Sequence, residues 1–344
     1  MKKKLFIDSR PGGDWGMDLL FSGLLYNLGP SFVVDFPAHE KHRMGTPVLM
    51  GDPEGDWGTE RRSLSFTPYN KELPLWDQKS VVSELRSGNI DTIFIDERRE
   101  SFELYMGLRA DLIDIPVVVV AGHDSFQNVS PEWVAGNYYP RHLKRMYLDN
   151  WSREYDALPY ARHYNWSVNF DHLWDFSERV DLLSKKEYDI CFMGYSSHPN
   201  RMRYIDHVLK RWGQLSNHIF LESRPNSFGG FIPKNEYFRI MAKSRICLNL
   251  RGAAENGKAM RFYEIPYVGS YMLSEWFPGI EDQVFPRIMP RVFNSIESMD
   301  REIEWALENE TGRERIAALD HWTTVEHNSS RARVREMLED LKDG

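Results

Sequence analysis

The sequence predicts an α/β protein built from two doubly wound Rossmann-like domains. Short apolar runs of strand length recur along the chain, and segments with helical spacing of apolar residues separate them. In each half a glycine-containing turn stands between a strand and a helix, at Gly12-Gly13 and at Gly194. The 344 residues exceed one average domain. We place an N-terminal domain at 1–180, a second at 181–325, and a C-terminal helical segment at 326–344, which we expect to pack back on the N-terminal domain.

The N-terminal half opens with the order strand, glycine turn, helix, strand that begins a doubly wound domain. Lys4–Asp8 is the first predicted strand and Pro11–Gly16 the turn. Apolar residues from Leu19 to Leu28 have helical spacing, and Gly29-Pro30 ends that helix. Phe32–Phe36 is the second strand. The turn lacks the full G-x-G-x-x-G spacing, so it is not interpreted as a dinucleotide fingerprint.

Regular structure resumes after a polar stretch at 38–75, in which Asp52 and Asp56 are interpreted as solvated turn and not as a metal site. We predict helices at Val81–Leu85 and Phe102–Leu112, strands at Thr92–Asp96 and Ile115–Val120, and an amphipathic surface helix at Arg141–Trp151. The run Ile115–Val120 suits the centre of a parallel sheet. His123 and Asp124 follow it, where open α/β sheets place ligands.

The C-terminal half repeats the alternation. Predicted strands are Tyr188–Met193, His218–Leu221, Ile246–Leu250 and Val268–Leu273, and predicted helices are Arg201–Trp212, Lys234–Lys243, a segment from Ser295 onward and Arg331–Leu341. The pattern is lost at about 165–187, which marks the domain boundary.

The stretch Ser244–Glu275 has the features of a phosphate site. A buried strand leads into a small, polar loop, and Lys258, Arg261 and Glu264 follow at spacings of three, which places them on one helical face. Cations and backbone N–H groups at a helix N-terminus bind phosphate. The Gly194–Ser197 turn offers two further hydroxyls, one of them on Ser196.

Composition narrows the functional classes. A net charge of −8 argues against a general nucleic-acid coat, although it leaves a local basic cleft open. The two cysteines, Cys191 and Cys247, lie in apolar runs and are interpreted as buried thiols. We expect no membrane-spanning segment and no signal peptide, since no apolar run nears the roughly 18 residues required and an aspartate follows the first apolar residues. A cytoplasmic protein is expected.

The C-terminal half resembles the glycosyltransferase domain of the spore-maturation (CgeB-like) proteins, over about residues 188–338. The resemblance is carried by Leu248-Asn249-Leu250-Arg251 and by Arg261-Phe262-Tyr263-Glu264-Ile265-Pro266 with Gly269. Pro278–Asp282, His327–Arg333 and Phe192-Met193-Gly194 with Arg201 also match. The resemblance implies a GT-B fold, in which two Rossmann-like domains face a cleft, and a glycosyltransferase of group 1 type that uses a nucleotide-diphosphate sugar.

The resemblance also implies roles for individual residues. Lys258 and Arg261, helped by Gly194 and Ser196, would neutralise the donor diphosphate, and Glu264 would accept the ribose hydroxyls. Arg251 and Gly13 complete the expected donor-binding set. Related retaining enzymes carry a glutamate where this chain has Asn256, so inverting and retaining chemistry both stay open. An inverting enzyme needs a base from the N-terminal domain, for which Asp14, His123 and Asp124 are the candidates.

We expect no metal and no cofactor beyond the donor, because no acidic pair stands at a strand end in a suitable context. The acceptor stays open: a polysaccharide precursor, a protein, a small metabolite or modified DNA. Two alternatives also stay open. One is a non-catalytic nucleotide-sugar-binding protein, and the other is a nucleotide-sugar epimerase, which would convert donor with no acceptor present.

Overall fold

The computed structural model describes residues 1–9, 15–39, 42, 73–108, 115–121, 136, 143–148, 158–163, 185–195, 199–222, 234–251, 261–277, 280 and 291–342. The chain divides into two compact units. Unit 1 comprises Met1–Val48, Gly55–His172 and Ser329–Gly344, and unit 2 comprises Leu49–Glu54 and Leu173–Asn328. The C-terminal segment therefore folds with the N-terminal unit.

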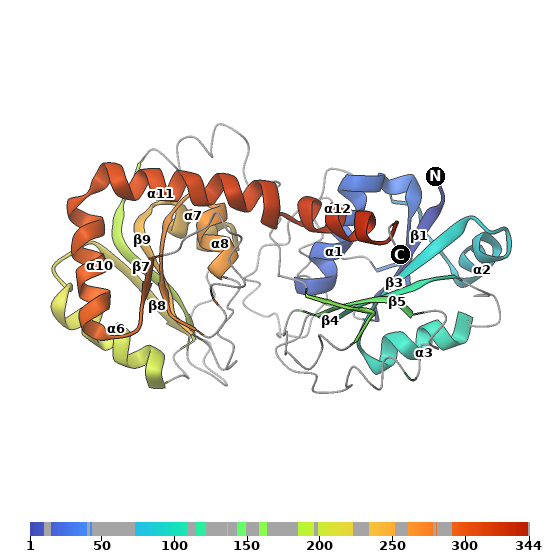
Figure 1. The fold of residues 1–344 in the computed structure, drawn as a ribbon, viewed down its shortest axis with the longest axis horizontal. Helices are drawn as coiled ribbons and strands as arrows, with labels where there is room; N and C mark the ends of the chain where they lie inside the picture. The colour runs from blue at the N-terminus through green and yellow to red at the C-terminus, as the bar shows by residue number, and fades with distance from the viewer. Residues whose placement is uncertain are drawn as a thin grey trace. The chain divides into compact units, whose positions relative to one another are not determined.

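Unit 1 contains a sheet of six parallel strands (Figure 1). The order is β2-β1-β3-β4-β5-β6. The strands are β1 (Lys3–Ile7), β2 (Val33–Phe36), β3 (Ile90–Asp96), β4 (Val117–Ala121), β5 (Leu143–Leu148) and β6 (Ala161–His163). The chain runs from β1 outward to β2 and then back past β1 to β3, so the connections reverse direction between β1 and β3. Crevices at such reversals are where doubly wound sheets bind ligands.

Helices cover both faces of this sheet because successive strand residues point to opposite sides. Helices α1 (Trp15–Leu28) and α12 (Ser330–Asp340) pack side by side on one face, in a core with Phe6, Phe94 and Val118. Helices α2 (Gln78–Arg86) and α3 (Arg99–Leu108) pack on the other face, in a core with Leu5 and Ile93. A short 3-10 helix, η1 (Pro30–Phe32), joins α1 to β2.

The predicted helix at Arg141–Trp151 is wrong, because Leu143–Leu148 forms strand β5 between β4 and β6. Leu143, Met146 and Leu148 are buried in the sheet core. Arg145, which suggested a surface helix, donates through Nε to Asp340 of α12 over 2.9 Å, and Tyr147 donates to the same carboxylate over 2.7 Å. Arg145 thus pairs with a residue nearly two hundred positions away, whereas the local sequence pattern predicted that its charge faces solvent.

Unit 2 contains a sheet of five parallel strands in the order β11-β10-β9-β7-β8 (Figure 1). The strands are β7 (Tyr188–Tyr195), β8 (Asn217–Glu222), β9 (Ser244–Asn249), β10 (Tyr271–Glu275) and β11 (Arg291–Phe293). The connections reverse direction between β7 and β9. The strand predicted from Val268 begins only at Tyr271, because Gly269, with φ of 74°, turns the chain after helix α8 (Arg261–Tyr267).

The helices of unit 2 also lie on both sides of its sheet. Helices α6 (Pro199–Arg211), α10 (Ile296–Glu308) and α11 (Glu310–Thr323) share one core with β7, β9 and β10. Helices α7 (Lys234–Ala242) and α8 pack against β9. A π-helical turn, η6 (Thr324–Asn328), follows α11. The predicted α/β class with two doubly wound parallel sheets is confirmed.

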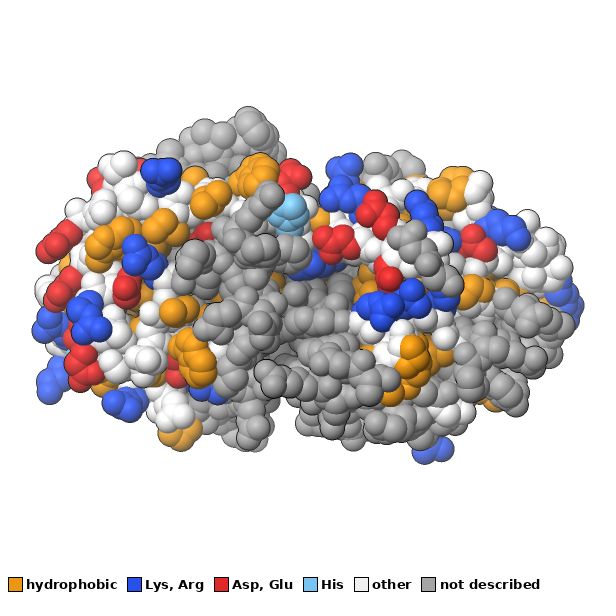
Figure 2. Space-filling model, viewed as in Figure 1, with side chains coloured by type: hydrophobic (Ala, Val, Ile, Leu, Met, Phe, Trp, Pro, Cys, Tyr) orange, Lys and Arg blue, Asp and Glu red, His pale blue; other side chains and the backbone are white. Residues whose placement is uncertain are grey.

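No described helix combines the length and the apolar character that a membrane crossing requires. On the face drawn in Figure 2, acidic and basic side chains are interspersed and form no extended coat of one sign. The mixed charge agrees with the composition.

Candidate functional site

The candidate site lies at the carboxyl ends of β7 and β9 and the start of α8, where the strand order of unit 2 reverses. Four residues singled out from the sequence meet there: Gly194 near the end of β7, Arg251 just after β9, and Arg261 and Glu264 in the first turn of α8. The parallel arrangement explains the meeting, since all strands deliver their carboxyl ends to one edge.

Arg261 joins the ends of the two central strands. Its Nη1 donates to the Met193 carbonyl over 3.0 Å and its Nη2 to the Leu250 carbonyl over 3.4 Å. The guanidinium lies over the Phe192 ring, 5.2 Å from its centroid. Gly194 leaves the room for this arrangement, because a Cβ at that position would lie 3.1 Å from Nη1 of Arg261.

Arg201, in the first turn of α6, brings a second guanidinium to the same place. Its Nη2 donates to the Arg251 carbonyl over 3.0 Å and to the Leu250 carbonyl over 3.5 Å. It also lies over Phe192, at 5.5 Å. Burial and the neighbouring Arg261 guanidinium lower the pKa of Arg201 to about 10. Two like charges held this close favour binding of an anion between or beside them.

Glu264 adds a carboxylate to this edge. It is buried and accepts a hydrogen bond from the Tyr237 hydroxyl of α7 over 2.8 Å. Burial, together with the Glu264 charge, raises the pKa of Tyr237 well above its ordinary value, so the phenol stays protonated and donates. Tyr237 therefore fixes the orientation of the Glu264 carboxylate.

Glu275, the last residue of β10, completes the described part of the site. Its Oε2 accepts from the Arg251 backbone N–H over 2.9 Å. One residue inward along the same two strands, the Asn249 amide donates to the Ser274 hydroxyl over 3.0 Å. These two contacts join the ends of β9 and β10 and hold the chain where it leaves the sheet at Arg251.

Six other predicted site residues lie outside the described residues: Gly13, Asp14, His123, Asp124, Ser196 and Lys258, as does Asn256. The sequence reasoning assigned no site role to Arg201, Tyr237 or Glu275. Arg201 and Glu275 carried a weak signal, because each stands at the boundary of a predicted element at the carboxyl edge of the sheet. Tyr237 carried none, since it stands inside a predicted helix of mixed polar and apolar residues with no motif around it.

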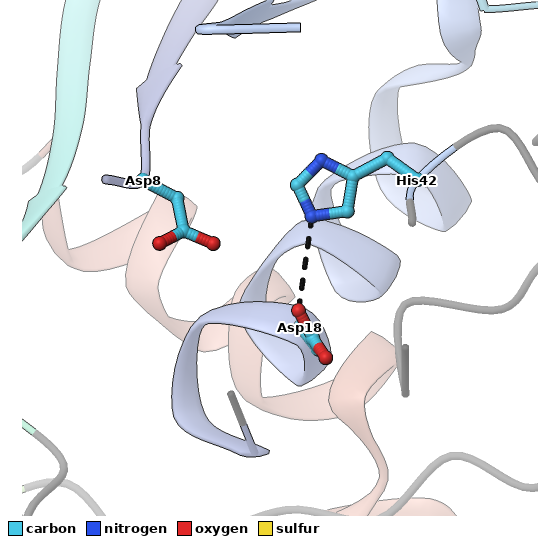
Figure 3. A group of neighbouring side chains, drawn as sticks. All are labelled: Asp8, Asp18 and His42. Atoms are coloured by element: carbon cyan, nitrogen blue, oxygen red, sulfur yellow. Dashed lines mark ion pairs between the residues drawn. The ribbon is translucent and has the colours of Figure 1, made fainter. Parts of the chain in front are cut away.

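Unit 1 contains a second cluster, which the sequence reasoning also missed. Asp8, Asp18 and His42 are buried, and one ligand atom of each lies within 4.8 Å of the others (Figure 3). Carboxylate oxygens and imidazole nitrogens are the donors that divalent transition metals bind.

Comparison with solved structures identifies the fold of the whole chain as GT-B. A glycosyltransferase from Rickettsia africae ESF-5 superposes with a TM-score of 0.56 at 12% identity, covering 99% of this chain and 98% of the other. Anabaena HepE in complex with UDP and glucose gives 0.54 at 13% identity, covering 100% of both chains. Sucrose-phosphate synthase from Thermosynechococcus elongatus gives 0.54 at 12% identity, covering 100% of this chain and 99% of the other.

At the level of sequence, the model of a family described as glycosyl transferase-like matches residues 180–339. That range covers nearly all of unit 2, the candidate site and helix α12. No curated protein matches the chain in sequence.

Proposed function

We propose that the protein is a glycosyltransferase that moves a sugar from a nucleotide-diphosphate donor held by unit 2 to a separate acceptor. One observation carries the proposal. Arg201 and Arg261 bring two guanidinium groups to the Leu250 carbonyl at the point where the strand order reverses, inside the segment that the glycosyl transferase-like model matches. We further propose that the chain falls in the spore-maturation (CgeB-like) branch, on the motifs at Leu248–Arg251 and Arg261–Pro266.

The chemistry requires positive charge at the leaving group. The bond between the sugar C1 and the diphosphate oxygen breaks, a bond from the acceptor oxygen to C1 forms, and the acceptor proton passes to a base. Charge builds on the departing diphosphate, which planar guanidinium groups stabilise through paired hydrogen bonds. We assign this task to Arg261 and Arg201, together with Gly194 and Arg251 at the same edge. Gly13, Ser196 and Lys258, which lie outside the described residues, are proposed as further donor ligands. On this account no metal is needed at the diphosphate.

Glu264 is the proposed ribose ligand. A buried carboxylate at a helix start accepts hydrogen bonds from a diol with both oxygens, and Tyr237 holds its orientation. The acceptor base is proposed to come from unit 1, with Asp14, His123 and Asp124 as candidates. Asn256, which stands where related retaining enzymes carry glutamate, leaves the stereochemistry to be measured.

An assay with a panel of nucleotide-sugar donors identifies the nucleotide base that the protein prefers. HepE was crystallised with UDP-glucose and with UDP and glucose, so UDP-sugars head the panel, followed by GDP- and TDP-sugars. The assay measures nucleotide release with and without candidate acceptors, in buffer that contains EDTA. We expect release from one donor class, stimulated by an acceptor and insensitive to EDTA.

Each alternative gives a different result in this assay. Donor binding with no release in the presence of any acceptor class would indicate a nucleotide-sugar-binding protein. Conversion of the donor sugar with no acceptor would indicate an epimerase. Loss of turnover on chelation, with the protein still folded, would contradict the metal-independent leaving-group chemistry.

A further inference from the structure

The buried cluster of Asp8, Asp18 and His42 in unit 1 has the composition and spacing of a metal site (Figure 3). Asp8 directly follows β1, Asp18 lies in the first turn of α1, and His42 lies beyond the end of β2. All three residues are 0% exposed. Their ligand atoms, two carboxylate oxygens and one imidazole nitrogen, lie within 4.8 Å of one another.

The orientation of His42 is set by a fourth residue. Its Nδ1 lies 3.0 Å from Oδ1 of Asp35, and its ring stacks on Phe21 with the centroids 4.1 Å apart. A carboxylate that accepts the Nδ1–H fixes the tautomer and leaves the lone pair on Nε2, as it does for most metal-binding histidines. Nε2 therefore faces Asp18 as a donor atom for a cation.

The distance from His42 Nε2 to Asp18 Oδ1 distinguishes this contact from a hydrogen bond. It is 3.7 Å, longer than the roughly 2.7–3.2 Å of an N–H···O bond. Two ligands on a tetrahedral Zn²⁺ with bonds of about 2.0 Å stand about 3.3 Å apart. A small side-chain movement thus brings both atoms onto one ion.

Arg98 approaches Asp8 but pairs more closely with Asp96. Its Nη1 lies 2.6 Å from Asp96 and 3.9 Å from Asp8. Arg98 is therefore paired chiefly with Asp96, and its contact with Asp8 is much the longer of the two.

We propose that Asp8, Asp18 and His42 bind one divalent transition-metal ion, with Zn²⁺ the best match to a mixed carboxylate and imidazole donor set. The ion is structural: it joins the end of β1, the start of α1 and the chain after β2. The site shares no residue with the donor site of unit 2, so it stands or falls independently of the proposed glycosyl transfer. A protonated His42 that pairs with Asp18 and Asp35 and binds no metal is the competing arrangement.

The test measures metal binding by the full-length chain, without an activity assay. Protein stripped by dialysis against a chelator is titrated with Zn²⁺ and with Co²⁺, and bound metal is counted by mass spectrometry after gel filtration. We expect one ion per chain, a higher melting temperature with metal, and a Co²⁺ absorption spectrum of low coordination number. Asp18→Asn and His42→Gln should each weaken binding at least a hundredfold.

The matched control is His207→Gln, because His207 also pairs with an aspartate, Asp300, at 3.0 Å but in unit 2. It should bind metal as the wild type does. No uptake by the wild type, or equal affinity in the Asp18 and His42 variants, overturns the proposal.

Two further outcomes keep the wild-type measurement decisive if those variants fail to fold. A thiolate-to-cobalt charge-transfer band would place the ion at Cys191 and Cys247, which are register partners on β7 and β9, and would overturn the assignment. A six-coordinate, water-like Co²⁺ spectrum with an unchanged melting temperature would do the same. A low-coordinate spectrum without the thiolate band, with raised melting temperature, supports it.

Discussion

The guanidinium groups of Arg201 and Arg261 both donate to the carbonyl oxygen of Leu250, over 3.5 and 3.4 Å. Arg201 comes from the helix after β7 and Arg261 from the helix after β9, so the convergence depends on the adjacency of those two strands. One carbonyl oxygen cannot neutralise two cations, and a diphosphate bound at this edge would reduce their mutual repulsion.

Replacing Arg201 with lysine should weaken binding of the nucleotide diphosphate by at least about tenfold, equivalent to about 1.4 kcal/mol. Lysine keeps the charge and loses the planar fork. Arg211→Lys, on the same helix, is the control: Arg211 is half exposed and pairs with Glu304 at 2.7 Å. Calorimetric titration of both variants should show a change only for Arg201→Lys, and equal affinities would argue against a ligand role for Arg201.

Replacing Tyr237 with phenylalanine should raise the KM for the donor about fivefold, because Glu264 loses the hydroxyl that orients it, a loss of about 1 kcal/mol. The value of kcat should change less. Tyr188→Phe, at the amino end of β7 with its ring against His218, should leave both constants unchanged. Steady-state kinetics checks this, and an unaltered KM in Tyr237→Phe would remove the positioning role.

Replacing Gly23 with alanine should destabilise unit 1 by on the order of 2 kcal/mol, through overpacking. A Cβ on Gly23 would overlap the Ser330 carbonyl oxygen and the Val334 side chain, where α1 and α12 touch. Gly107→Ala, in α3 with no atom within 4 Å of the added carbon, should be neutral or slightly stabilising. Thermal unfolding compares the two, and equal melting temperatures would contradict close packing of α12.

Asp320→Asn should stabilise the protein more at about pH 8 than at about pH 4. Burial raises the pKa of the Asp320 carboxyl from 3.8 to about 7. Between these values the folded chain holds a proton that the unfolded chain has lost, so the contribution to stability falls as pH rises, by up to about 1.4 kcal/mol per unit. Above about pH 7 the loss is complete.

The readout for Asp320 is the difference in melting temperature between variant and wild type as a function of pH, which cancels the titration of other groups. Asp206→Asn, exposed on α6, should show a flat difference. A flat difference for Asp320→Asn as well would mean that this carboxyl titrates normally in the folded chain.

Much of the fold could be predicted because both faces of the central strands are buried. Nearly all residues of such strands are therefore apolar, and the strands are recognisable in the sequence. The predicted strands Tyr188–Met193, Ile246–Leu250 and Ile115–Val120 hold such apolar runs, and β7, β9 and β4 overlap them. Strand β5 could not be predicted, because Arg145 interrupts it and its partner, Asp340, is 195 residues distant. Local periodicity holds no information about a contact at that separation.

Contacts between residues that are distant in the sequence also limited the prediction of the donor site and of the cluster in unit 1. Arg261 and Glu264 could be found because helix spacing and a loop signature surround them. Tyr237 and Glu275 contact Glu264 and Arg251, which are 27 and 24 positions away. Nothing in the neighbourhood of Tyr237 marks it, and Glu275 is marked only by its place near the end of a predicted strand. Asp8, Asp18 and His42 come from three separate elements, and only the folded sheet brings them together.

The central claim, that unit 2 holds the diphosphate of a nucleotide-sugar donor, is tested most directly by thermal unfolding in the presence of UDP, GDP and TDP, with the wild type and with Arg261→Lys. We expect one nucleotide to raise the melting temperature of the wild type by mass action and Arg261→Lys to lose most of that rise. No rise with any of the three, or an equal rise in the variant, would contradict the claim.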